Sequence, residues 1–136
     1  MSHRRLSHTW LAFVWLQSAL LFPACAPVGQ YRRPETPAER ARSVAAGVSD
    51  IVAARCDLES HCANIGPGQK FDSRSMCESK MQGETAVTLN TADCPLGVEP
   101  RKLDACVASI LAQDCGNMFD ALTRWNQCRN GQICYH

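Results

Sequence analysis

Cysteines are the side chains of this sequence that could do chemistry, and there are nine of them in 136 residues. Thiols in such number could ligate metal ions, act as redox or nucleophilic groups, or close disulfides, and the compartment decides between these roles. Cys25 stands apart near the N-terminus. The other eight are Cys56, Cys62, Cys77, Cys94, Cys106, Cys115, Cys128 and Cys134.

The cysteine spacing argues against a metal site and against a redox centre. Structural zinc sites use cysteine pairs with about two to four intervening residues. The closest pairs here, Cys56 with Cys62 and Cys128 with Cys134, have five. A thioredoxin-type centre needs a C-x-x-C motif, and the sequence has none. We therefore expect neither metal nor cofactor.

Other catalytic groups are sparse. After residue 24 the only histidines are His61 and His136, and neither lies in a motif that would pair it with a nucleophile. Asp57 and Glu59 are two residues apart, so on a helix they point to different sides. The turn Gly66-Pro67-Gly68 matches no phosphate-binding pattern. The sequence predicts a protein that is not an enzyme.

The N-terminus reads as an export signal. Arg4 and Arg5 precede the apolar run of residues 11–22, which is shorter than the roughly 20 residues of a membrane-spanning helix. We assign residues 1–24 to a signal peptide. Export places the chain in an oxidising compartment, where an even set of cysteines normally forms disulfides.

Cys25 is the expected lipidation site. The sequence Leu21-Phe22-Pro23-Ala24-Cys25 resembles a lipobox, in which a small residue precedes the cysteine that receives diacylglycerol. Setting Cys25 aside leaves eight cysteines, enough for four disulfides. The alternative is ordinary cleavage after Ala24-Cys25-Ala26, which would place Pro27 directly after the cut.

The rest of the chain reads as a tether followed by one domain. Residues 25–37 contain three prolines and predict a flexible tether, and residues 38–136 form the cysteine-rich domain. The formal net charge of the full chain is +1. With no basic field, we expect no nucleic-acid partner.

Hydrophobic periodicity predicts an all-α bundle of about four helices. The first is capped by Thr36 and ends at Gly66-Pro67-Gly68. The second is capped by Ser73 or Ser75, with Ser75 and Glu78 matching a capping box. The third opens at Glu99-Pro100, and its expected apolar face comprises Leu103, Cys106, Val107, Ile110 and Leu111. The fourth runs from Asn117 through Met118, Leu122 and Trp125 to Cys128 and is stopped by Asn130-Gly131.

Helix geometry limits the disulfide pairing. Cys56 and Cys62 would lie about 9 Å apart along one helix, and Cys106 and Cys115 about 13 Å apart along another. Both separations are too long for a bond within the helix. We expect bonds between helix ends and loops, such as Cys62 with Cys77, while the remaining pairing stays open.

The segments RCDLESHCANIGPGQKF, SRSMC and DCPLGVEPRKLDACVASILAQDC, with a closing C-x5-C, resemble a family of uncharacterised Gram-negative lipoproteins associated with natural-product biosynthesis. The resemblance covers most of residues 40–134. It implies a lipid-anchored envelope protein with a shared disulfide frame, and it supplies no catalytic residues. With Ala26 after Cys25, lipoproteins of this kind are generally sorted to the outer membrane.

The leading hypothesis is a non-catalytic module, anchored by lipid and facing the periplasm, whose helices bind another envelope protein or a small molecule. One alternative is a thiol-redox or other accessory enzyme of a biosynthetic pathway, which requires a reactive thiol. Another is a secreted disulfide-rich effector, which requires release from the membrane.

Overall fold

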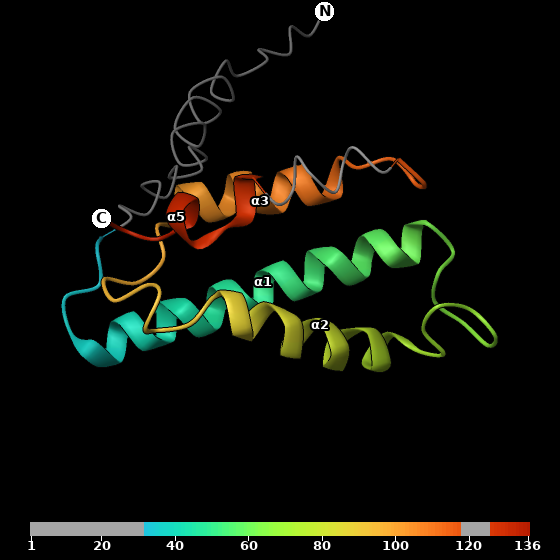
Figure 1. Ribbon diagram of the computed structural model, residues 1–136, viewed down its shortest axis with the longest axis horizontal. Helices are drawn as coiled ribbons and strands as arrows, with labels where there is room; N and C mark the ends of the chain where they lie inside the picture. Colours follow the sequence, from blue (N-terminus) through green and yellow to red (C-terminus); the bar gives the residue numbers. More distant parts are fainter. Residues whose placement is uncertain (1–31, 118–125) are drawn as a thin grey trace, which may run out of the picture. The chain divides into compact units, whose positions relative to one another are not determined.

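The computed structural model describes residues 32–117 and 126–136. Its helices are α1 (Pro37–His61), α2 (Arg74–Thr88), α3 (Pro100–Leu111) and the short α5 (Asn130–Ile133) (Figure 1). In this part of the chain, β structure is limited to the isolated bridges Ile65–Phe71 and Val98–Cys134. The predicted all-α, disulfide-linked fold is confirmed. The signal peptide, Cys25, the tether up to residue 31, and Met118, Leu122 and Trp125 lie outside the described residues.

Local sequence signals set the start of α1. The Thr36 hydroxyl accepts from the Glu39 backbone N–H at 3.1 Å, and the Glu39 carboxylate accepts from the Thr36 N–H at 2.8 Å. This reciprocal capping box is the predicted one. The helix ends at His61, earlier than the Gly66-Pro67-Gly68 turn that was expected to stop it. None of the described helices is long and apolar enough to cross a membrane.

The second and third helices follow their predicted caps with two differences. Ser73 caps α2 by accepting from the Met76 N–H at 3.3 Å, so the expected capping box of Ser75 and Glu78 is wrong. In α3, Leu103, Cys106 and Ile110 are buried, whereas Leu111 is 52% exposed and does not belong to the apolar face. The face is narrower than the sequence suggested, since α3 packs on α1 and α5 through a face that does not include Leu111.

The C-terminal segment also differs from expectation. Asn130-Gly131 was expected to stop the fourth helix, but these residues begin α5. The segment is fixed on both sides: the Tyr135 N–H donates to the Gly97 carbonyl at 3.0 Å, and the Arg33 guanidinium lies 4.8 Å from the Tyr135 ring centroid. The start of α1 and the end of the chain therefore meet at one end of the bundle.

Helix α1 is the central element. It packs against α2 on one side and α3 on the other, and α1 and α2 run antiparallel (Figure 1). The Val98 N–H donates to Ser43 Oγ at 3.2 Å near the start of α1. The core is formed by the buried side chains Val44, Val48, Ile51, Val52, Ala54, Cys56, Phe71, Cys77, Met81, Leu89, Cys94, Val98, Leu103, Cys106, Ile110, Ile133 and Cys134.

Four disulfides join these elements. They are Cys56–Cys77, Cys62–Cys115, Cys94–Cys134 and Cys106–Cys128, with sequence separations of 21, 53, 40 and 22 residues. Neither of the pairs excluded on helix geometry occurs. Each bond ties different segments together, and four disulfides are typical of extracytoplasmic proteins.

The expected bond between Cys62 and Cys77 is wrong. Cys77 lies in the first turn of α2 and bonds to Cys56, one and a half turns before the end of α1, with the two Cα atoms 6.0 Å apart. The connection between α1 and α2 brings the start of α2 back along α1, so Cys77 meets the buried stripe rather than the helix end. Cys62, at the C-cap of α1, instead reaches Cys115 beyond α3.

Candidate functional site

A cavity of about 640 Å³ is the candidate site. It lies between the middle of α1, the end of α2, the end of α3 and the C-terminal segment. Its volume falls in the range of about 300–1,000 Å³ that is usual for small-molecule sites. The described lining residues are Ile51, Arg55, Thr85, Val87, Thr88, Leu89, Asp93, Ile110, Cys128, Arg129, Asn130 and Gly131.

The helical repeat explains how these residues meet. Ile51 and Arg55 are four residues apart on α1 and therefore project from the same side. Thr85 and Leu89 repeat the same spacing at the end of α2. Cys128 is held beside α3 by its disulfide to Cys106, which brings the C-terminal segment to the cavity.

Three apolar side chains lie behind the cavity lining and expose little surface to it. Ile110 is fully buried, and Leu89 and Ile51 are 2% and 5% exposed. The mouth is more open, since Val87, which also lines the cavity, is 76% exposed. Six of the twelve described lining residues are polar or charged, so a ligand in this cavity would meet both polar groups and apolar surface.

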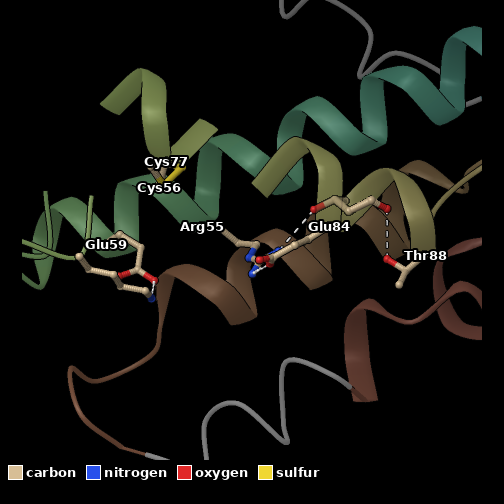
Figure 2. A network of polar contacts seen from close by, with 8 residues as sticks. Arg55, Cys56, Glu59, Cys77, Glu84 and Thr88 are labelled. Carbon is tan, nitrogen blue, oxygen red and sulfur yellow. Dashed lines mark hydrogen bonds and ion pairs between the residues drawn. A yellow bond between two sulfur atoms is a disulfide. The ribbon is translucent and has the colours of Figure 1, made fainter. Parts of the chain in front are cut away.

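Arg55 carries the main polar contact of the wall. Its Nη2 donates to Glu84 Oε2 at 2.8 Å, and its Nη1 lies 3.5 Å from Thr85 Oγ1 (Figure 2). The Arg55 side chain is 20% exposed and that of Glu84 is 47% exposed. Thr85 is itself buried, and its carbonyl accepts from the Thr88 hydroxyl at 3.1 Å.

Asp93 is the acidic group of the lining, and it is held locally. Its carboxylate accepts from the Asn90 side-chain amide at 2.7 Å. The Asn90 side-chain oxygen in turn accepts from the backbone N–H groups of Ala92 and Asp93. This Asx-type turn fixes the loop at the edge of the cavity.

A second polar cluster surrounds Glu59 near the Gly66-Pro67-Gly68 turn. Glu59 accepts from the Asn64 amide at 2.7 Å and forms an ion pair with Lys70. Asp57, the neighbouring carboxylate, pairs instead with Arg74 at 2.6 Å. The two carboxylates thus have separate partners, as their spacing predicted, and they form no acid–base pair.

The Glu59 cluster predicts a pH-dependent contribution to stability. Burial raises the pKa of Glu59, but hydrogen bonds from Lys70 and Asn64 outweigh it, so its pKa is lowered from 4.5. The ionised Glu59 carboxylate therefore stabilises the fold fully at pH values above its pKa in the unfolded chain. This stabilisation is lost as the pH falls through its pKa in the folded protein. Glu59→Gln should lower the free energy of unfolding at pH 7 by about 0.5–1 kcal/mol, a small value because Lys70 is half exposed and solvent screens the pair.

Urea denaturation of the wild-type protein and Glu59→Gln at pH 7 and about pH 3 measures this effect. The difference between the two proteins should shrink at the lower pH. A difference of equal size at both values would contradict the role of the ionised carboxylate.

Among the described residues, no group of three or more His, Cys, Asp or Glu side chains could hold a metal ion. His61 is exposed in the last turn of α1. All eight domain cysteines are in disulfides.

The sequence singled out no residue of the cavity as a ligand-binding group. The one feature of the sequence that could have indicated this cavity is Arg55, a charged residue four positions after the buried Ile51.

A comparison with protein-family models matches residues 56–136 to a family of unknown function, DUF6184. The match begins at Cys56 and includes all eight paired cysteines and most of the cavity lining. The chain belongs to this family. The DUF6184 description links the chain neither to lipoproteins nor to natural-product biosynthesis, so those parts of the resemblance stay predictions. Searches of curated proteins and of solved structures found no match.

Proposed function

We propose that this DUF6184 protein is an exported, non-catalytic module that binds a small amphipathic molecule in the cavity between α1, α2 and the C-terminal segment. The observation that carries the proposal is the cavity itself, with about 640 Å³ of space and a lining that combines apolar with polar and charged side chains. The disulfides support it because they join the segments that form the walls, so the site is held open without a ligand.

We further propose that Cys25 carries a lipid that anchors the module in the cell envelope, facing the periplasm. Eight cysteines in four disulfides leave Cys25 as the odd thiol, which supports modification at that position. The pairing of all eight domain cysteines also favours a binding module over a thiol-redox enzyme, because such an enzyme needs a reactive thiol. A role accessory to natural-product biosynthesis is compatible with a small-molecule site.

Intact mass of the exported protein, before and after reduction, tests the anchor and the frame together. Diacylglycerol on Cys25 should appear as added mass, and reduction should add eight hydrogens for four disulfides. An unmodified protein that starts after the signal peptide and is released from the membrane would contradict the anchor and favour the secreted effector.

A matched pair of glycine variants tests the cavity. Gly131 lies in α5 and lines the cavity, and Gly83 lies in α2 away from it. At both positions an added Cβ meets no atom within 4 Å, so a side chain is accommodated. Gly131→Phe places a ring at the cavity and should weaken binding of a neutral apolar fluorophore, N-phenyl-1-naphthylamine, about fivefold or more.

Gly83→Phe is the control and should leave the affinity unchanged. Fluorescence titration of the three proteins gives the dissociation constants. Equal affinities in all three, or no saturable binding by the wild-type protein, would contradict the proposed site.

A further inference from the structure

We propose that the ligand is an amphipathic anion, and that Arg55 binds its carboxylate by releasing Glu84. This inference rests on the proposed function, because it names the ligand class of the same cavity. It goes further by assigning a recognition residue and a competitor within the protein. The ligand then places an apolar chain or ring in the cavity and its carboxylate against the Arg55 guanidinium.

Arg55 is placed to reach both the cavity and the surface. It lines the cavity, and its side chain is 80% covered by neighbouring atoms. Its partner Glu84 does not line the cavity and lies on the exposed side of α2, as seen beside Arg55 in Figure 2. A guanidinium has five donors in a planar fork that suits a carboxylate bound through two parallel hydrogen bonds.

The existing contact with Glu84 uses that fork only in part. One distance, Nη2 to Oε2 at 2.8 Å, joins the two side chains, and Nη1 is directed to Thr85 Oγ1 instead. Because Glu84 is about half exposed, water solvates it when it leaves, and an ion pair of this exposure contributes about 1 kcal/mol or less. A carboxylate that approaches from the cavity can accept two parallel hydrogen bonds from the guanidinium, where Glu84 accepts one, and so displaces it.

The remaining lining fits the same ligand class. Two arginines, Arg55 and Arg129, and one aspartate, Asp93, line the cavity, and the Asp93 carboxylate already accepts from Asn90. The Thr85 hydroxyl can donate to a second carboxylate oxygen. Val87, which is 76% exposed, gives the cavity an apolar surface that a sugar or an inorganic anion would not use, while Ile51, Leu89 and Ile110 lie buried behind the lining.

Calorimetric titration with decanoate and decanol tests the inference, since the two probes share a chain and differ in charge at pH 7. Decanoate should bind about tenfold more tightly than decanol. Arg55→Gln should remove this preference, and Glu84→Gln should strengthen decanoate binding severalfold while leaving decanol unchanged. Arg74→Gln, which alters an exposed ion pair outside the cavity, should change neither affinity.

The possible outcomes separate the two proposals. If decanol binds as tightly as decanoate, or if Glu84→Gln weakens decanoate binding, the carboxylate assignment is overturned while the cavity stands. If neither probe binds, both proposals are overturned. Should Arg55→Gln fail to fold, Arg55→Lys serves instead, because lysine keeps the charge and loses the fork; it should reduce the preference for decanoate.

Discussion

Replacing both Cys56 and Cys77 with alanine should lower the free energy of unfolding by about 2–5 kcal/mol. Closing the 21-residue loop accounts for about 3 kcal/mol of this through the entropy of the unfolded chain. The two sulfurs are also fully buried, so their removal leaves a void between α1 and α2. Denaturation in urea under oxidising conditions measures the loss, and both cysteines are changed so that no free thiol remains.

The matched control replaces Cys62 and Cys115, whose bond spans 53 residues and lies at the other side of α1. The entropy of the unfolded chain predicts that replacing this pair lowers the free energy of unfolding by about 4 kcal/mol. Cys115 is exposed, so little packing is lost. Only the Cys56 and Cys77 variant should also weaken binding of the neutral fluorophore, because that bond fixes α2 on α1. A stability change below about 1 kcal/mol in the first variant would contradict its structural role.

Proteolysis without reduction checks the pairing in these proteins. Trypsin should leave two disulfide-linked products from the wild-type domain. One joins residues 81–101 to 130–136, and the other joins residues 56–70, 75–80, 103–124 and 125–129. Further cleavage after Glu59 separates Cys56 from Cys62 and shows which of them holds Cys77. A product that joins Cys62 to Cys77 would contradict the structure.

Ile110→Ala should lower the free energy of unfolding by about 2–3 kcal/mol, in the lower part of the range for large-to-small core changes. Ile110 is fully buried in α3, which accounts for the size of the effect. It also lies next to the cavity, so the surrounding side chains can relax into the space that the substitution leaves, and this reduces the loss. The enlarged cavity should still admit the neutral fluorophore.

Leu111→Ala is the control for this change, because Leu111 is the next residue of the same helix and is 52% exposed. It should alter stability by no more than about 0.5 kcal/mol. Thermal and urea denaturation of both variants give the comparison. Equal effects at the two positions would contradict the orientation of α3 on α1.

The helices could be predicted because their signals are local. Thr36 with Glu39 and the proline at residue 100 identify helix starts from a few adjacent residues, and the structure has both starts where the sequence placed them. The end of α1 was placed too late because the glycine turn lies beyond the C-cap at Cys62. Helix ends depend on capping by residues that carry weaker signals.

The disulfide pairing and the cavity depend on how helix faces meet, which periodicity does not specify. Cys62 and Cys77 flank the same turn, yet α2 lies back along α1, so Cys77 meets Cys56. The cavity draws its lining from separate segments around α1, α2, α3 and α5, and no short motif joins them. The one local indication of the cavity was Arg55, a charged residue beside the apolar stripe of α1. Its partner Glu84 is 29 residues away in the sequence.

Amide chemical-shift mapping of the exported protein during titration with decanoate tests the cavity most directly. Saturable shifts should cluster at the lining residues Ile51, Arg55, Thr85, Leu89, Ile110 and Gly131. The turn around Gly68, at the other end of the bundle, should be unaffected. Shifts concentrated at that turn or at exposed apolar residues such as Met76 and Leu96, or no saturable shifts at all, would contradict a ligand site in this cavity.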